Sequence, residues 1–199
     1  RLEYRGYDSA GVAVIGDRSE RFVNKAVGKV NELAELIDNS PMPGTVGIAH
    51  TRWATHGVPS QANAHPHLSD NIAVVHNGII ENYKELKEQL VAKGYVFRSE
   101  TDSEAIAHLL HDAYQDSGDL FVSLKQVIGQ LQGAYGLCVL STDNPDLILG
   151  CRSGSPLVVG LGIDENFLAS DVLALRQVTD KFIYLEEGDI VQLERDCVT

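Results

Sequence analysis

The stretch from His50 to Gly57 concentrates side chains that could do chemistry. It reads His-Thr-Arg-Trp-Ala-Thr-His-Gly, after a short apolar run and before Pro59. A guanidinium fork matches the two oxygens of a carboxylate, so Arg52, beside an aromatic wall and hydrogen-bonding side chains, could hold one. The alternative is an exposed loop in which Trp53 packs locally. Residue types alone leave these interpretations at even odds, since binding residues favour loops on a rigid scaffold.

A second candidate is the tripeptide His76-Asn77-Gly78, which follows an apolar run at residues 72–75. Glycine lets the backbone turn and approach a ligand with its N–H unobstructed. The Asn77 side-chain amide beside the Gly78 N–H would form a two-donor oxyanion hole, in which each donor lowers a reaction barrier by roughly 3–4 kcal/mol. The alternative is a tight Asn-Gly turn between strands. Taken alone, the dipeptide favours the turn.

Asp102 is a third candidate, at the predicted start of a helix. It could pair with an ammonium group as a counter-ion. The alternative is an acid in the first helical turn that complements the helix dipole, which contributes roughly 0.3–1 kcal/mol. The sequence around Asp102 does not separate these two roles.

No residue pattern indicates a metal site, a phosphate-binding loop or a reactive thiol. His65-Pro66-His67 lacks a third ligand at suitable spacing, which favours a structural role. Gly154 and residues 160–162 match neither the lysine nor the glycine spacing of a phosphate loop. The cysteines are far apart, and two lie in strand-like runs where cysteine is a small buried hydrophobe. The three are Cys138, Cys151 and Cys197.

The composition is that of an acidic globular protein. Its formal net charge of −12 is spread along 199 residues, which argues against nucleic acid and acidic membrane surfaces as partners. A content of 44% hydrophobic and 22% charged residues suffices to bury one sizeable core. No apolar run approaches the roughly 20 residues of a membrane span, and residues 1–5 lack the apolar stretch of a signal peptide. We therefore expect a cytoplasmic protein in a reducing compartment.

The elements that must position these residues are mostly short strands. Apolar runs bounded by turn residues predict strands at 11–15, 46–50, 72–76, 134–140, 147–151, 156–161, 167–170, 182–185 and 190–193. The last two runs flank a Glu187-Gly188-Asp189 turn, which predicts a hairpin.

Four apolar stripes at helical spacing predict helices at residues 30–37, 80–90, 101–113 and 121–131. Gly94 is the expected C-cap of the second helix. Thr101 and Glu104 have the spacing of a capping box at the start of the third. Because strands outnumber helices and regular alternation is missing, the pattern predicts antiparallel sheets covered by helices in one domain.

These motifs together resemble one known family, the glucosamine-6-phosphate synthases, also called glutamine:fructose-6-phosphate amidotransferases. The similarity follows almost the whole chain in order, which makes chance negligible. The segments that carry it are residues 1–11 (RLEYRGYDSAG), 47–57 (GIAHTRWATHG), 63–67 (NAHPH), 75–82 (VHNGIIEN), 99–104 (SETDSE), 152–157 (RSGSPL) and 185–189 (LEEGD).

The resemblance implies an α+β fold of the N-terminal-nucleophile hydrolase type, a four-layer αββα arrangement with two stacked antiparallel sheets between helices. It implies hydrolysis of the side-chain amide of L-glutamine to glutamate and ammonia, without a cofactor. It also implies full-length homodimers, in which sugar-phosphate isomerase domains receive the ammonia and make glucosamine 6-phosphate from fructose 6-phosphate.

The resemblance also assigns roles to the candidate residues. Arg52 is expected to hold the substrate α-carboxylate, and Asp102 the α-ammonium. The catalytic groups are expected to be the Asn77 side chain and the Gly78 N–H, which hold the developing oxyanion. The other implied binding residues are Trp53, Thr55 and His56, in a loop that closes over glutamine and excludes water, with Arg5 in a supporting position.

The chain departs from the family at its first residue. The family nucleophile is a cysteine at the mature N-terminus, whose α-amino group assists proton transfer, whereas this chain starts at Arg1. We therefore expect residues 1–199 to form one glutamine amidotransferase domain without its N-terminal strand, its nucleophile and the isomerase domains. As printed, the chain is expected to bind glutamine poorly and not to hydrolyse it. Two alternatives stay open: a catalytically inactive glutamine-binding module, and the glutaminase domain of another amidotransferase.

Overall fold

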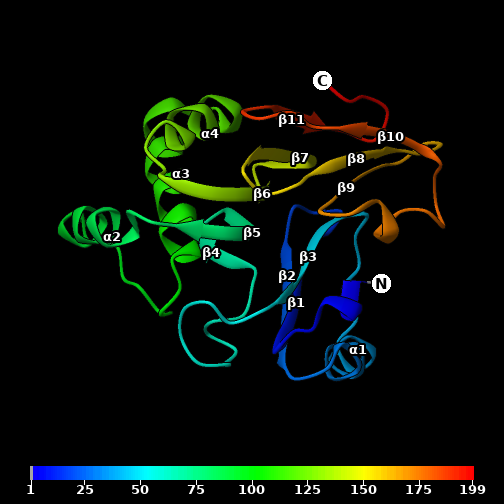
Figure 1. The fold of residues 1–199 in the computed structure, drawn as a ribbon, viewed down its shortest axis with the longest axis horizontal. Coiled ribbons are helices and arrows are strands. Elements are labelled where there is room, and N and C mark those ends of the chain that lie inside the picture. The colour runs from blue at the N-terminus through cyan, green and yellow to red at the C-terminus, as the bar shows by residue number, and fades with distance from the viewer. Residues whose placement is uncertain (1) are drawn as a thin grey trace.

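The computed structural model describes residues 2–199, and Arg1, on which the expected lack of a nucleophile rests, lies outside the described residues. The strands pair antiparallel in three sheets (Figure 1). The first sheet has the order β2 (Arg21–Val27), β1 (Ser9–Ile15), β3 (Val46–Arg52). The second has the order β11 (Ile190–Leu193), β7 (Asn144–Ser153), β6 (Gly133–Ser141), β5 (Ile72–Ile80), β4 (His67–Ser69). The third, small sheet has the order β10 (Lys181–Tyr184), β8 (Val158–Leu161), β9 (Asn166–Ala169).

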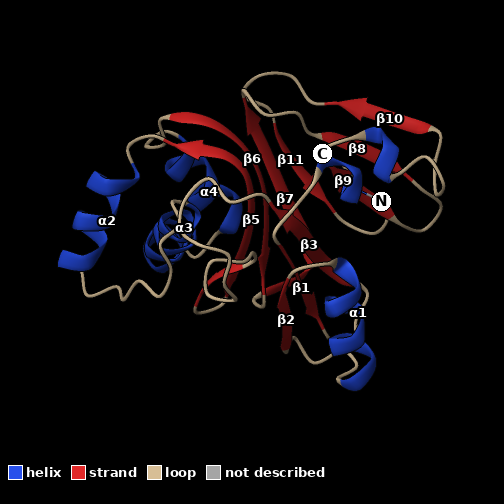
Figure 2. Cartoon of the chain, turned by 60° about the horizontal axis from the view of Figure 1, so that its bottom comes forward, coloured by secondary structure: helices blue, strands red, loops and turns tan. Residues whose placement is uncertain are grey.

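Helices lie on the outer faces of the two larger sheets. They are α1 (Val30–Asn39), α2 (Tyr83–Ala92), α3 (Ser103–Ser117) and α4 (Leu120–Ile128), with short 3₁₀ turns η1 (Leu2–Arg5) and η2 (Val172–Ala174). One of them, α2, packs against α3. Figure 2 shows α3 and α4 on one side of the strands and α1 on the other, giving four layers. Within residues 2–199, none of the helices combines the length and apolarity that a membrane crossing requires.

Strand β5 lies between two layers of the core. Val74 belongs to the cluster that packs against α3 and α4, whereas Val75 belongs to the cluster shared with β1 and β3. Because side chains alternate along a strand, His76 points toward α3 and Asn77 toward β3. The alternation of side chains along β5 therefore places Asn77 in the space between the two larger sheets.

The Asn77-Gly78 dipeptide lies within β5 and pairs with Gly136 and Tyr135 of β6. The turn that the dipeptide alone favours is therefore wrong. Gly78 has φ +125°, and a Cβ built on it would lie 1.9 Å from the carbonyl oxygen of Ala134. Glycine is required here because the backbone of β6 approaches so closely.

The predicted hairpin of residues 182–185 and 190–193 is wrong. Strand β10 pairs with β8, whereas β11 pairs with β7 in another sheet. The turn at Gly188 is present, with φ +84°, but the two strands diverge after it. The small sheet that β10 joins is also additional to the two stacked sheets that were expected.

The predicted capping box of α3 is also wrong. The Glu104 carboxylate accepts hydrogen bonds from the backbone N–H groups of Arg98 and Ser99 and from the Ser99 hydroxyl, at 2.8, 2.7 and 2.6 Å. The Thr101 hydroxyl contacts Nε2 of His67 at 2.9 Å. Tertiary partners thus replace the local reciprocal cap, and they fix the segment that leads into α3. By contrast, the expected cap at Gly94 is confirmed, with φ +97° after α2.

Candidate functional site

The eight residues assigned to the site from the sequence all line one cavity of about 780 Å³. Small-molecule sites typically have volumes of roughly 300–1,000 Å³. The walls come from η1, the end of β3 and the loop after it, the second half of β5, and the start of α3. The eight residues are Arg5, Arg52, Trp53, Thr55, His56, Asn77, Gly78 and Asp102.

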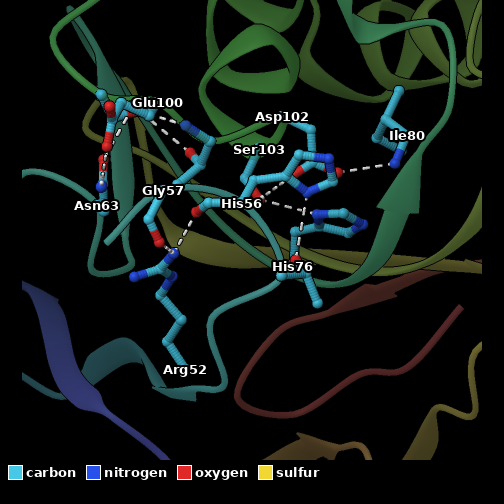
Figure 3. A network of polar contacts seen from close by, with 12 residues as sticks. Arg52, His56, Gly57, Asn63, His76, Ile80, Glu100, Asp102 and Ser103 are labelled. Carbon is cyan, nitrogen blue, oxygen red and sulfur yellow. Dashed lines mark hydrogen bonds and ion pairs between the residues drawn. The ribbon is translucent and has the colours of Figure 1, made fainter. Parts of the chain in front are cut away.

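Arg52, the last residue of β3, is buried and holds the loop that follows it. Its Nη2 donates hydrogen bonds to the carbonyl oxygens of His56 and Gly57, the latter at 2.9 Å. Its Nη1 makes two longer contacts, each 3.4 Å, with the carbonyl oxygen of Val58 and the carboxylate of Asp8. Figure 3 shows the guanidinium turned toward the loop backbone. Nη1 makes the weaker contacts, so it is the nitrogen of Arg52 best able to donate hydrogen bonds to a ligand carboxylate.

Asp102 is buried at the N-terminal end of α3 and is fixed from the neighbouring strand. Its Oδ2 accepts a hydrogen bond of 2.7 Å from the backbone N–H of Ile80, at the end of β5 (Figure 3). Its Oδ1 lies 3.9 Å from Nδ1 of His56 and 3.5 Å from the hydroxyl of Ser103. The side chain therefore keeps one oxygen toward the loop and the cavity, which is the disposition a counter-ion for an ammonium group needs.

His56 brings the two charged candidates together. Arg52 contacts its backbone carbonyl, while Asp102 faces its imidazole. The ring also packs edge-on against Tyr83, with the centroids 5.2 Å apart. A buried cation and a buried anion thus flank one loop residue at the wall of the cavity. Thr55 lies beside it, with its hydroxyl 3.3 Å from the His56 ring.

Asn77 is oriented by a residue that the sequence did not assign to the site. Nε2 of His50, on β3, lies 2.8 Å from Oδ1 of Asn77. The amide nitrogen of Asn77 is then free to point elsewhere, and the adjacent Gly78 lines the same cavity. The side-chain amide and the Gly78 backbone next to it are the two groups predicted from the sequence as oxyanion donors, and both residues line this cavity. The spacing of His50 and Arg52, two residues apart in a strand, was the available signal that both side chains face the same way.

A second unassigned pair closes the loop at its far end. Nδ2 of Asn63 donates to the carbonyl oxygen of Val58 at 2.9 Å and to the Glu100 carboxylate at 3.0 Å. Oδ1 of Asn63 accepts from the backbone N–H of Glu100 at 2.9 Å. Figure 3 shows this clip beside the loop. Arg52 at one end and Asn63 at the other hold residues 53–60 in place, and nothing in the local sequence signals so distant a partner as Glu100.

The remaining expected site residues have other contacts. Arg5 pairs with Asp171 at 2.6 Å and donates to the hydroxyl of Ser170 at 3.0 Å, which ties η1 to the segment after β9. Trp53 is 70% exposed and lies beside Gly6. Exclusion of water by this ring requires movement of the loop, and it stays a prediction.

Buried histidines lie beneath the site. Desolvation lowers the pKa of His50 to about 4 and the pKa of His67 to about 3, and it holds the pKa of His65 well below its usual range. The Ser103 hydroxyl lies 3.0 Å from Nε2 of His65 and 2.8 Å from Nδ1 of His76. These rings are uncharged at neutral pH, and they fill the space beneath the site while making hydrogen bonds to neighbouring side chains. The structural role predicted for the His65-Pro66-His67 segment agrees with these contacts.

The cysteines have the environments expected of inert thiols. Burial raises the pKa of Cys138 and of Cys151 to about 12. Cys197 is exposed near the C-terminal end, away from the cavity lining. Among residues 2–199, no group of three or more histidine, cysteine, aspartate or glutamate side chains is arranged to hold a metal ion.

Comparisons with known proteins agree on one kind of domain. Residues 50–177 match the family described as glutamine amidotransferase domain. The chain is 61% identical over 199 residues to the glutamine--fructose-6-phosphate aminotransferase (isomerizing) of Pseudomonas aeruginosa, covering 100% of this chain and 33% of that protein. It is 54% identical over 198 residues to the protein of that name from Treponema pallidum, covering 100% of this chain and 31% of that protein.

Solved structures of amidotransferases have a similar fold. The glutamine phosphoribosylpyrophosphate amidotransferase from B. subtilis is 26% identical, with a TM-score of 0.83 over 100% of this chain and 43% of that chain. A glutamine aminotransferase class-II domain protein from Silicibacter pomeroyi is 15% identical, with a TM-score of 0.68 over 96% of this chain and 89% of that chain, and shows likeness of fold alone. The present chain spans about a third of the length of the curated relatives it matches.

Proposed function

The chain belongs to the glutamine amidotransferase domain family, and on that premise we propose that it forms the L-glutamine site of a longer protein that hydrolyses the side-chain amide to glutamate and ammonia. The expected fold is confirmed: antiparallel sheets stacked between helices form the N-terminal-nucleophile arrangement of the structural relatives. The observation that carries the proposal is the meeting of a buried guanidinium, a buried carboxylate and an oriented amide at one cavity.

Glutamine carries a carboxylate and an ammonium on its α-carbon, and its reactive amide three carbons away. In the proposal, Nη1 of Arg52 receives the α-carboxylate and Oδ1 of Asp102 receives the α-ammonium. Both residues are only 3% exposed, so their charges are poorly screened by water and strongly favour a ligand that complements them. Thr55 and His56 would contact the same end of the substrate from the loop.

The amide end of glutamine would lie beside Asn77 and Gly78. Attack on the amide carbon converts its carbonyl oxygen to an oxyanion, and the two N–H donors stabilise that charge. The C–N bond then breaks as the nitrogen takes up the proton given up by the attacking thiol, so ammonia leaves, and water hydrolyses the resulting thioester to release glutamate and restore the thiol. The Asn77 side chain and the Gly78 backbone supply no nucleophile, and the raised pKa of the Cys138 and Cys151 thiols keeps both protonated at neutral pH. The proposal therefore takes the attacking thiol from outside the sequence printed here.

In the wider proposal, the full-length gene product uses the ammonia to make glucosamine 6-phosphate from fructose 6-phosphate in the cytoplasm. Isomerase domains would supply the sugar-phosphate site, and the full-length protein would be a homodimer. Identities of 54–61% to aminotransferases acting on fructose 6-phosphate, against 26% to the phosphoribosylpyrophosphate enzyme, support this assignment over another amidotransferase. An inactive glutamine-binding module is the other candidate, since the described residues explain binding better than turnover.

Calorimetric titration with L-glutamine tests the binding site. We expect Arg52→Ala to weaken glutamine binding at least about tenfold, since a charge-assisted hydrogen bond is worth roughly 1.5–3 kcal/mol. Asp102→Asn should bind glutamine less tightly. It should also lose most of the preference for glutamine over glutaramate, because glutaramate lacks the α-amino group that the Asp102 carboxylate would pair with. Arg18→Ala, at an exposed turn, is the control and should bind like the unmodified chain.

Unchanged glutamine affinity in Arg52→Ala would remove the carboxylate assignment. A preference for glutamine over glutaramate that survives in Asp102→Asn would remove the ammonium assignment. Glutamate release by the full-length gene product separates the two functional candidates: release supports the hydrolase, whereas tight binding without release supports the inactive module.

A further inference from the structure

The hydrogen bond between His50 and Asn77 joins two strands that belong to different sheets. His50 lies on β3 in the first sheet, and Asn77 lies on β5 in the second. Their contact, Nε2 to Oδ1 at 2.8 Å, has the length of a well-formed hydrogen bond. Asn77 is half-buried, and its carboxamide has no other hydrogen bond to the described residues. His50 is thus the one described side chain that fixes which end of this amide faces the cavity.

The contact determines where the proton of His50 resides. An amide oxygen only accepts hydrogen bonds, so Nε2 must carry a proton to donate to it. The buried ring is uncharged at neutral pH, because desolvation lowers its pKa to about 4, and a neutral imidazole has a single N–H. Nδ1 therefore carries no proton, and it forms no well-aligned hydrogen bond among the described residues, although the His76 backbone lies near the ring and raises its pKa. The opposite tautomer would accept from Asn77, and the amide would then turn its oxygen toward the cavity.

The surroundings of His50 keep its ring in this orientation. The antiparallel register of β1 and β3 places Gly11 directly across from His50. A Cβ on Gly11 would lie 2.0 Å from the carbonyl oxygen of His65, so glycine there lets the His65 backbone approach. The His65 ring then packs against that of His50, with the centroids 4.2 Å apart and the planes tilted by 44°. The Ser103 hydroxyl fixes the His65 ring in turn, at 3.0 Å from Nε2.

We propose that His50 is a positioning residue for amide hydrolysis: as the Nε2–H tautomer it holds Oδ1 of Asn77, so that the Asn77 NH₂ group points at the oxyanion position. This inference rests on the proposed function, in which Asn77 is an oxyanion donor. It assigns His50 a role in the transition state rather than in binding the α-carbon groups of glutamine, which Arg52 and Asp102 contact.

The kinetic test measures kcat and KM for glutamate release by the full-length gene product. His50→Leu removes the donor and should lower kcat about 10- to 100-fold, part of the loss expected for a whole oxyanion donor, with KM within about threefold. His50→Gln places an amide N–H at similar reach and should recover most of that loss. In the Asn77→Ala background, His50→Leu should lower kcat no further, because the group that it positions is gone.

The opposite results overturn the role. A fall of kcat in His50→Leu that is equally large with and without Asn77 means that the histidine only supports the fold. A rise in KM with unchanged kcat means that it serves substrate binding. Absence of glutamate release from the unmodified protein overturns the proposed function instead.

A nitrogen-15 NMR spectrum of the His50 imidazole tests the geometry independently of turnover. We expect an Nε2–H tautomer whose Nε2 resonance moves in Asn77→Ala, while the His111 ring, far along α3, does not change. If the ring is the Nδ1–H tautomer, or if the Nε2 resonance does not move in Asn77→Ala, the inference is overturned whatever the kinetics show.

Discussion

At Gly78 the backbone of β5 passes so close to β6 that no side chain fits. The Cβ of an alanine would lie 1.9 Å from the Ala134 carbonyl oxygen, and φ is +125°. We expect Gly78→Ala to lower the free energy of unfolding by several kcal/mol, because the strands must separate or shift register. Urea denaturation followed by circular dichroism measures the loss.

Gly94→Ala is the matched control for Gly78→Ala. Gly94 also has a positive φ, +97°, but nothing lies within 4 Å of the position of its Cβ. Its substitution should cost only the conformational term, about 1 kcal/mol. Equal losses in the two variants would contradict the argument from the close approach of β6 and leave backbone conformation as the sole reason for Gly78.

At the scale of single residues, the sequence predicted positions that chemistry or resemblance marks and missed those that only the fold brings together. Arg52, Asp102, Asn77 and Gly78 were predicted, and they line one cavity. The contact of Asp102 with the N–H of Ile80 was not predictable, since it joins a helix start to a strand 22 residues earlier. Whether Asp102 is a counter-ion or a dipole-complementing acid likewise depends on what surrounds it, which composition does not specify.

Among the elements, the loop of residues 53–60 depends on its clip to the segment before α3. Asn63→Ala removes three hydrogen bonds, which leaves the Val58 carbonyl with only its longer contact to Arg52 and removes the tie to Glu100. We expect faster hydrogen exchange in the loop and a weaker affinity for glutamine, because a lost hydrogen bond costs roughly 0.5–1.5 kcal/mol and the loop carries Thr55 and His56. Exchange mass spectrometry and calorimetry measure the two effects.

Gln61→Ala is the control for the loop clip. Gln61 is exposed and lies two residues from Asn63 in the same turn. Its substitution should leave exchange in residues 53–60 unchanged. A comparable acceleration in Gln61→Ala would mean that any change in this turn loosens the loop, and that the contact with Glu100 is incidental.

The elements themselves were predicted as far as local pattern specifies them. The runs at 72–76 and 134–140 are strands β5 and β6 because alternation and β-branched residues favour that conformation. Strand β2 was missed because its polar residues, Arg21, Asn24 and Lys25, interrupt the apolar pattern. The false hairpin at Gly188 shows the limit: a turn signal is local, whereas the partner of each strand is decided by the sheets that bury it.

For the whole molecule, the pattern predicted antiparallel sheets covered by helices, and the resemblance supplied their stacking. Separate clusters fill the space between α3 and the second sheet and between the two larger sheets. A third cluster joins the small sheet to β7 and β11. Apolar periodicity predicts that one face of an element is buried, but it does not predict which element packs against that face. The number of layers could therefore not be predicted from it. The cavity lies where β3, β5 and α3 converge, so its shape depends on that packing.

The buried histidines make the stability of the whole fold dependent on pH. The unfolded chain protonates its histidines below pH 6.5, whereas the pKa of His50 is about 4 and that of His67 about 3 in the folded state. Well above pH 6.5 both rings are neutral in either state, and they contribute no pH dependence there. As pH falls from 6.5 toward 4, the two histidines bind protons in the unfolded chain but stay neutral in the folded chain. The free energy of unfolding therefore falls by about 1.4 kcal/mol per pH unit for each ring.

Urea denaturation at pH 7.5, 6.0 and 5.0 should therefore show a free energy of unfolding that falls steeply only in the acidic interval, by about 3 kcal/mol per pH unit from these two rings. His67→Gln removes one of them, and its slope should be smaller by about 1.4 kcal/mol per pH unit, even if the variant is less stable throughout. His111→Gln, which removes a histidine outside the cluster, is the control for the number of titrating groups. If His67→Gln keeps the full slope, protons taken up on unfolding bind elsewhere, and the neutral imidazoles beneath the site are not what makes the fold sensitive to acid.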